Sequence, residues 1–183
     1  MLKRKLQWML LAFILFIGGV MYVQSDHEWA LTQRTMTEVS EGVQQGDKMT
    51  PFHLGNAEGQ EVYVTGNNNE NMFLIFFTSW CHVCSEQWEQ LDAAKSEGLL
   101  EHVKVIPVNL TGSERSEGTV AQYIQELPIS SDQVLLDRDE VVQKQYEVVG
   151  VPTILLINEE GVIEERSHGM MTLEKMRESN FFR

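Results

Sequence analysis

The chain is poor in cysteine and in positive charge. Only two of its 183 residues are cysteine, and 14 lysine and arginine residues stand against 27 aspartate and glutamate residues, which gives a formal net charge of −13. A surface this acidic repels a phosphate backbone, which argues against nucleic acid as a partner. The sequence also lacks a nucleotide-binding or flavin motif, an internal repeat and a low-complexity tract. Its length fits one ordinary domain with a small appendage.

Both cysteines lie in the stretch TSWCHVCSEQW, where Cys81 and Cys84 are three positions apart. A closed zinc site usually needs four protein ligands, and the chain has no second CxxC and no H-x3-H spacing among its histidines. Covalent haem attachment needs CxxCH, whereas Ser85 follows Cys84. A structural bridge over so short a loop gives little entropic stabilisation. A redox pair is therefore favoured, and transfer of a soft metal and a structural bridge remain as alternatives.

Apolar runs alternate between the strand and the helix pattern along most of the chain. The strand over 72–77 is apolar on both faces, as a central strand should be. The helix that follows this strand offers Val83, Trp88 and Leu91 for a buried stripe. Alternating strands and helices with a C-terminal hairpin predict an α/β fold with a mixed central sheet. The other predicted strands are 61–66, 103–110, 133–137, 153–158 and 162–169, and the predicted helices are 81–98, 118–127, 139–147 and 172–180.

This arrangement puts the two cysteines at a strand-to-helix junction. If the helix begins near Cys81, then Cys84 lies one turn inside it on the same face, close enough for a disulfide. Cys81 would sit among the unpaired N–H groups at the positive end of the helix dipole, which stabilise a thiolate. We therefore expect Cys81, exposed at the helix tip, to attack the disulfide of a client, and Cys84, behind it, to resolve the mixed disulfide.

The N-terminus carries a long apolar run over residues 6–23, close to the roughly 20 residues needed to cross a bilayer. Lysine and arginine at positions 3–5 precede the run and acids follow it, an asymmetry that predicts an inside N-terminus and an outside body. A cleaved signal peptide is the competing interpretation. The expected segments are a cytoplasmic tip and transmembrane anchor over 1–25, a polar stalk over 26–47 and the remaining domain over 48–183.

Two segments, FLIFFTSWCHVC and VGVPTILLINEEG, together resemble the thioredoxin fold, a central mixed sheet flanked by helices. Over about residues 45–180 the chain is similar to the membrane-anchored ResA and TlpA group of extracytoplasmic thiol-disulfide oxidoreductases, including an extra helix and strand between Gly118 and Asp137. W-C-x-x-C combined with V-P-T is a far more specific signal than CxxC alone. The resemblance implies that Pro152 is cis, faces the disulfide and leaves the backbone of Val151 free to bind a substrate strand. The residues alone would suggest a trans proline at the start of a strand.

The resemblance also implies an activity, that of an enzyme on the outer face of a bacterial cytoplasmic membrane that exchanges the Cys81–Cys84 dithiol or disulfide with client proteins. It would act as a reductant, for instance of apocytochrome c, and receive electrons from a membrane thiol carrier, with no cofactor beyond its own disulfide. Three alternatives remain: a thiol oxidase for secreted proteins, a copper-handling assembly protein that uses the same two cysteines as soft ligands, and a redox-silent binding module.

Two positions depart from the pattern of the family. Thioredoxin carries a buried acid six residues before its first cysteine, where this chain has Ile75. ResA-like proteins have a glutamate three residues after the second cysteine, where this chain has Gln87. The adjacent Glu86 is turned by about 100° around the helix and is expected in solvent. Neither Gln87 nor Glu86 therefore receives an acid–base role, and proton transfer is left to water, to His82 or to a carboxylate elsewhere.

His82, Val83 and Trp80 are the residues expected to tune the redox potential of the pair. As a cation beside Cys81, His82 would stabilise the thiolate and make the disulfide more oxidising, whereas a neutral exposed imidazole would do little. We therefore expect a more oxidising pair than in a ResA-type reductant that carries a negative residue at this position.

Overall fold

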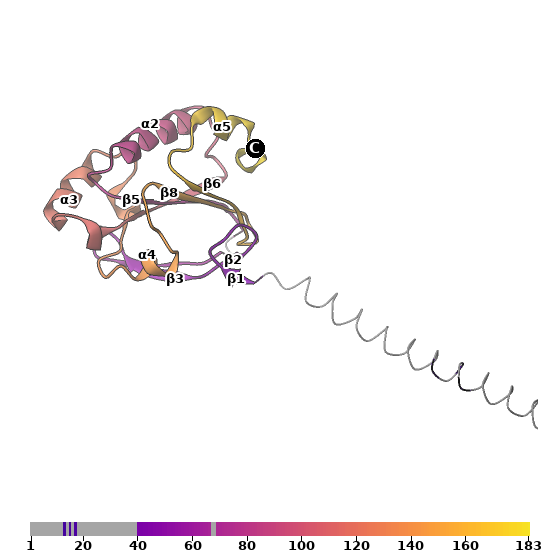
Figure 1. Ribbon diagram of the computed structural model, residues 1–183. Coiled ribbons are helices and arrows are strands. Elements are labelled where there is room, and N and C mark those ends of the chain that lie inside the picture. Colours follow the sequence, from indigo (N-terminus) through magenta and orange to yellow (C-terminus); the bar gives the residue numbers. More distant parts are fainter. Residues whose placement is uncertain (1–12, 14, 16, 18–39, 67–68) are drawn as a thin grey trace, which may run out of the picture. The chain divides into compact units, whose positions relative to one another are not determined.

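The computed structural model of the chain describes residues 13, 15, 17, 40–66 and 69–183 (Figure 1). Within them, Ser40–Arg183 form one unit. The predicted anchor, apart from three isolated helical positions, and residues 26–39 of the predicted stalk lie outside the described residues. Among the residues that are described, no helix is both long and apolar enough to span a bilayer.

Five strands form the central sheet, in the spatial order β7 (Leu135–Leu136), β6 (Val103–Asn109), β5 (Asn71–Phe77), β8 (Thr153–Ile157) and β9 (Ile163–His168). β5, β6 and β7 run parallel, whereas β8 is antiparallel to β5, and β9 is antiparallel to β8. The mixed central sheet expected from the sequence is thereby confirmed. β5 occupies the middle of the sheet and is buried on both faces, which explains why its sequence is apolar at every position from Met72 to Phe77.

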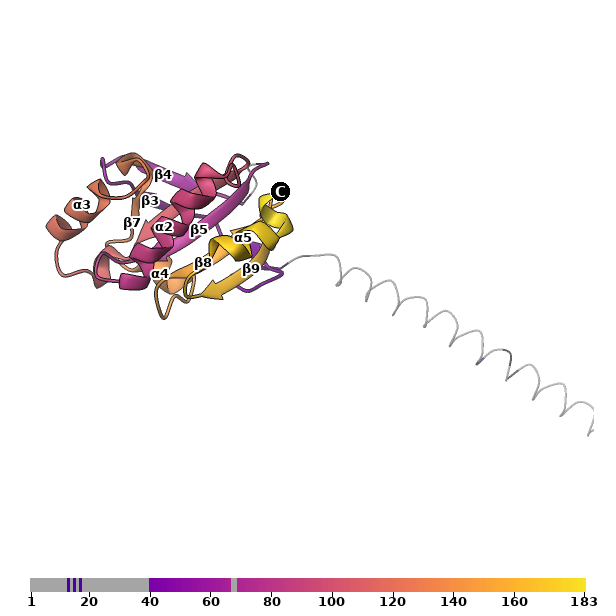
Figure 2. The same cartoon turned by 90° about the horizontal axis from the view of Figure 1, so that it is seen from above.

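Helices and a hairpin cover the two faces of this sheet (Figures 1 and 2). One face packs against three helices, α2 (His82–Ser96), α3 (Glu117–Gln125) and α5 (Leu173–Glu178). The other face packs against a short helix, α4 (Val141–Gln145), and a hairpin of β3 (Phe52–Gly55) and β4 (Glu61–Val64). The chain therefore folds as a three-layered α/β unit with the sheet in the middle.

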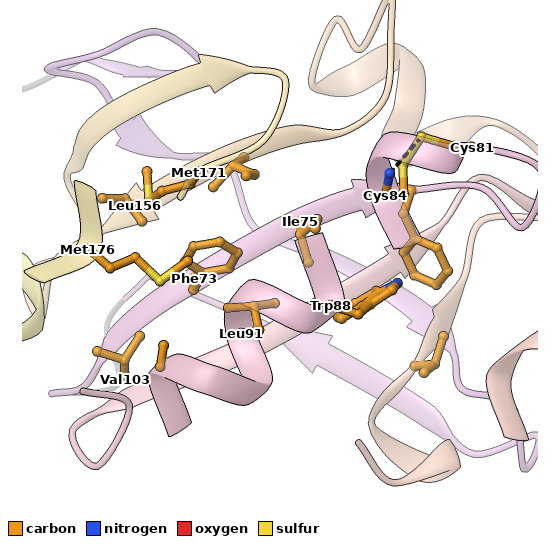
Figure 3. Close-up of a cluster of buried hydrophobic side chains, with 14 of the residues drawn as sticks. Phe73, Ile75, Cys81, Cys84, Trp88, Leu91, Val103, Leu156, Met171 and Met176 are labelled. Carbon is orange, nitrogen blue, oxygen red and sulfur yellow. Dashed lines mark hydrogen bonds between the residues drawn. A yellow bond between two sulfur atoms is a disulfide. The ribbon is translucent and has the colours of Figure 1, made fainter. Parts of the chain in front are cut away.

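The side chains of β5 alternate between the two apolar cores. One set lies beneath α2, where Figure 3 shows Phe73 and Ile75 directed toward the helix, and the other lies on the side of α4 and the hairpin. Full burial of each such side chain contributes about 1.5–3 kcal/mol. β5 is thus fixed from both sides, and its C-terminal end gives a rigid base to the turn that carries the cysteines. The first set is Phe73, Ile75 and Phe77, and the second is Met72, Leu74 and Phe76.

The folded unit begins earlier than the predicted boundary at residue 48. Residues 40–47, which the sequence assigned to the polar stalk, fold onto the domain: β1 (Glu41–Gly42) pairs in parallel with β2 (Lys48–Met49), and Val43 is buried. Arg166 on β9 donates to the carbonyl of Val43 at 3.0 Å. A single buried valine among polar residues leaves no periodic signal, so hydrophobic patterning missed this segment.

Helix α2 buries a different stripe from the one predicted. Trp88 and Leu91 are buried as expected, but Val83 is 41% exposed. The buried face runs through Cys84 and Gln87 instead, because each step along a helix turns the side chain by about 100° and Val83 is one step away from that face. A buried glutamine next to the cysteines is a feature that hydrophobic patterning could not reveal.

Candidate active site

Cys81 and Cys84 form a disulfide where β5 meets α2 (Figure 3), with their Cα atoms 5.2 Å apart. Cys81 is the N-cap residue of α2, and its Sγ accepts a hydrogen bond from the backbone N–H of Cys84 at 3.1 Å. Sulfur therefore occupies the capping position that a serine or aspartate oxygen usually takes. When the pair is reduced, the same N–H group and the helix dipole stabilise a thiolate at Cys81.

The two sulfurs differ in accessibility. Cys81 is 7% exposed, and Cys84 is fully buried. The expectation that Cys81 would be exposed at the helix tip is therefore corrected, because the loop before β8 lies over it and brings the carbonyl oxygen of Val151 to 3.6 Å from its Sγ. Of the two cysteines, Cys81 alone retains accessible surface, and the assignment of Cys81 as the attacking thiol remains our prediction.

The loop that faces the disulfide contains a cis peptide bond between Val151 and Pro152, the conformation that the family resemblance implies. A hydrogen bond within the loop stabilises its conformation, in which the hydroxyl of Thr153 donates to the carbonyl of Gly150 at 2.7 Å. The carbonyl of Val151 is thereby presented to Cys81. A disulfide sulfur carries no proton, so this contact becomes a hydrogen bond only when Cys81 is a thiol.

The three residues expected to tune the redox potential lie at the surface around the disulfide. Trp80 and Val83 are 57% and 41% exposed and present apolar surface there. The side chain of His82 reaches along α2, and its Nε2 lies 3.3 Å from Oε1 of Glu86. Glu86 is partly exposed, and it contacts His82 rather than the cysteines. A protonated His82 therefore has a carboxylate as its immediate partner.

Gln87 lies one turn after Cys84 and is fully buried. Its Nε2 donates to the carbonyl of Met171 at 3.2 Å, and its Oε1 accepts from the N–H of Met171 at 2.7 Å. Both ends of the amide are used, so Gln87 ties α2 to the segment between β9 and α5. Ile75, the other position where the family pattern has an acid, is buried in the apolar core. Neither position holds a carboxylate.

A carboxylate that the sequence did not single out lies beside the active-site turn. Glu114 accepts hydrogen bonds from the N–H of Ser79 at 2.5 Å, from the hydroxyl of Ser79 at 2.6 Å and from Nδ2 of Asn109 at 2.8 Å. It stands in a polar loop, where composition gives no signal. The signal that could have found it is topological, because β5 and β6 are parallel neighbours and the loops after their C-terminal ends meet at one edge of the sheet.

A disulfide at a helix tip, a cis-proline loop against it and a mixed sheet beneath them define the thioredoxin-like class of proteins. The family model described as the AhpC/TSA family matches residues 45–166. This match spans most of the folded unit, and the chain belongs to this thioredoxin-like family.

Relatives of known name agree with this assignment. The chain is 30% identical over 127 residues to the sporulation thiol-disulfide oxidoreductase A of Bacillus subtilis, covering 69% of this chain and 76% of that protein. It is 27% identical over 136 residues to the thiol-disulfide oxidoreductase ResA of the same organism, covering 72% of each. The crystal structure of StoA from Bacillus subtilis matches with a TM-score of 0.60 at 30% identity, over 70% of this chain and 95% of that one. The protein is therefore a thiol-disulfide oxidoreductase with Cys81 and Cys84 as its CxxC pair.

Proposed function

We propose that the protein is a reductant, whose Cys81–Cys84 dithiol reduces disulfides in extracytoplasmic client proteins. The contact between His82 and Glu86 carries this proposal. A protonated His82 on its own would stabilise the thiolate and favour an oxidant, but the carboxylate of Glu86 offsets that charge. The carbonyl oxygen of Val151, 3.6 Å from Sγ of Cys81, also disfavours a negative sulfur. A less stabilised thiolate makes the dithiol a stronger reductant.

In this proposal the domain is held at the outer face of a bacterial cytoplasmic membrane by residues 1–25. The apolar run over residues 6–23, with cations before it and acids after it, supports the anchor and its orientation. Clients are proteins with disulfides, apocytochrome c-type proteins among them, and their strands pair with the backbone of Val151. The cysteine pair is the one redox group of the chain in this scheme, so a membrane thiol carrier supplies the electrons.

Fractionation of cells that express the full chain tests the location. The protein should stay with the membranes in alkaline carbonate, and a membrane-impermeant thiol reagent should label the reduced protein in intact spheroplasts. Recovery in the soluble fraction would contradict the anchor. Labelling that occurs only after lysis would contradict the outward orientation.

Insulin reduction and copper binding, measured on the same preparation, test the activity. A reductant should reduce insulin catalytically and bind Cu(I) no more tightly than other vicinal dithiols do. Tight Cu(I) binding without insulin reduction would support the copper-handling alternative, in which the two cysteines act as soft ligands. Rapid oxidation of reduced client peptides, with slow insulin reduction, would support the oxidase.

Replacing His82 with glutamate should lower the redox potential of the Cys81–Cys84 pair. The added negative charge beside the attacking sulfur destabilises the thiolate and with it the reduced form. Replacing Glu86 with glutamine should raise the potential, because the positive charge of His82 is no longer offset. Equilibration against glutathione measures both variants, and we expect shifts of about 10–30 mV, where about 30 mV is a tenfold change in the equilibrium. An unchanged or higher potential for His82→Glu would refute the predicted influence of this side chain.

A further inference from the structure

The turn that carries Cys81 is held from outside by the loop after β6. The carboxylate of Glu114 accepts from both the N–H and the hydroxyl of Ser79, at 2.5 and 2.6 Å. The indole N–H of Trp80 donates to the carbonyl of Ser113 at 3.3 Å. Neighbouring residues of one short loop therefore hold the two residues that directly precede the attacking thiol.

Glu114 is itself fixed in place. Asn109, fully buried at the end of β6, donates from Nδ2 to Oε1 of Glu114 at 2.8 Å. The orientation of this amide is set by Thr111, whose hydroxyl donates to Oδ1 of Asn109 at 2.9 Å. Three donors converge on the carboxylate, and hydrogen bonds to an ionised acceptor are roughly twice as strong as neutral ones. These three hydrogen bonds hold the carboxylate in one position, from which it can fix Ser79.

The turn has few hydrogen bonds of its own. Within the described part of the chain, the hydroxyl of Thr78 is buried without a hydrogen-bond partner. The N–H of Cys81 reaches the carbonyl of Thr78 at a distance of 3.3 Å. The carbonyl of Cys81 accepts from the N–H groups of Cys84 and Ser85 at 3.1 and 3.2 Å, so α2 fixes the C-terminal side of Cys81. The contacts of Ser79 and Trp80 with the loop after β6 fix the segment before it.

We propose that Glu114 is a positioning residue for thiol-disulfide exchange. By holding Ser79, it keeps the backbone N–H of Cys84 directed at Sγ of Cys81, the contact that stabilises the attacking thiolate. The step it serves is attack of that thiolate on one sulfur of a client disulfide, in which a new S–S bond forms, the client S–S bond breaks and its other sulfur leaves as a thiolate. The inference rests on the exchange activity of the family and is independent of the direction of electron flow.

Two variants of Glu114 separate the hydrogen bonds from the charge. Glu114→Ala removes all three hydrogen bonds. Glu114→Gln can keep them, since its Oε1 accepts from the N–H of Ser79 and from Asn109, while its Nε2 donates to the Ser79 hydroxyl, which can rotate its proton away. Glu117→Ala is the matched control for loss of an acid, because Glu117 is nearby in sequence but pairs with Arg138 at the surface.

The measurements are the rate at which the reduced protein attacks an aromatic disulfide reagent, followed over pH, and the redox equilibrium against glutathione. Glu114→Ala should react about tenfold more slowly at neutral pH. It weakens the hydrogen bond from the N–H of Cys84 to the charged sulfur of Cys81, and one hydrogen bond to a charged group changes an equilibrium by at least about that factor. The rising limb of its pH–rate profile should move to higher pH. Glu117→Ala should stay close to wild type. Glu114→Gln should react faster than Glu114→Ala, because its neutral amide keeps the hydrogen bonds in a weaker form. A purely structural role would lower the unfolding temperature and leave the pH profile in place.

Wild-type kinetics in Glu114→Ala would overturn the proposal. So would a Glu114→Gln variant as slow as Glu114→Ala, because the charge and not the hydrogen bonds would then be the cause. If Glu114→Ala does not fold, Ser79→Ala takes its place: it removes the hydroxyl donor alone, and an unchanged rate and pH profile would count against the proposal. If the wild-type protein itself attacks no disulfide, the exchange activity is refuted. Measurable and equal rates in wild type and variant would instead refute only the role proposed for Glu114.

Discussion

Replacing Cys84 with alanine should turn the protein into a covalent trap for its clients. In our assignment of the two thiols, Cys81 attacks the client, and Cys84, whose Cα lies 5.2 Å from that of Cys81, then releases the client by closing the disulfide. Well-placed intramolecular groups act with effective molarities on the order of 10⁵ M or more. Without Cys84, the mixed disulfide can be released only by thiols from solution, so its lifetime should increase by several orders of magnitude.

Non-reducing electrophoresis of cells that express Cys84→Ala should show adducts that disappear on reduction, and mass spectrometry should place each client on Cys81. Cys81→Ala is the matched control and should form no adducts, because Cys84 has no accessible surface from which to attack. Clients joined to Cys84 would reverse the assignment of the two thiols. The trapped clients also test the proposed location, since a set made up of cytoplasmic proteins would contradict it.

The elements that present the cysteines could be predicted from local sequence. β5 is apolar at every position from Met72 to Phe77, and α2 ends near Gly98, which has a φ of +78°. Each signal lies within a few adjacent residues, so it can be recognised without knowing which helices or strands pack against that element. The cis state of Pro152 has no such local signal, because most X–Pro bonds are trans. It was reached through the family resemblance.

Hydrogen bonds between distant residues account for two features of the site that the sequence did not predict. Glu114 and Ser79 are 35 residues apart, and Gln87 and Met171 are 84 apart. Periodicity reports which face of an element is apolar, but it does not report which polar side chain meets which backbone group across the fold. Both pairs involve ordinary polar residues, which are more often solvated than buried. They became visible only when the register of β5 and β6 and the packing of α2 were known.

Replacing Gln87 with glutamate should destabilise the protein strongly at neutral pH and only weakly at acidic pH. An ionised carboxylate cannot donate to the carbonyl of Met171, and it would be fully buried. Burial raises the pKa of such a carboxyl by about three units, which corresponds to about 4 kcal/mol. The protonated acid keeps both contacts, because its hydroxyl donates to the carbonyl and its other oxygen accepts from the N–H.

The pH dependence has a definite sign. In the folded variant the introduced carboxyl binds its proton more tightly than in the unfolded chain, so the free energy of unfolding falls as pH rises. The loss should begin above about pH 4, near the pKa of an unfolded glutamate, and level off near about pH 7, where the folded carboxyl has also ionised. Denaturant unfolding at several values across this range, with the wild type beside it, gives the measurement.

Gln90→Glu is the matched control, because it adds the same charge to the same helix. Among the residues that the structure describes, Gln90 hydrogen-bonds only through its Oε1, which accepts from the N–H of Leu173 at 2.9 Å. Its partly exposed side chain can keep this role as a carboxylate. Its free energy of unfolding should stay within about 0.5 kcal/mol of wild type at each pH. An equal loss in both variants would point to general repulsion in a chain of net charge −13. A difference that grows with pH would assign the effect to the buried contact between Gln87 and Met171.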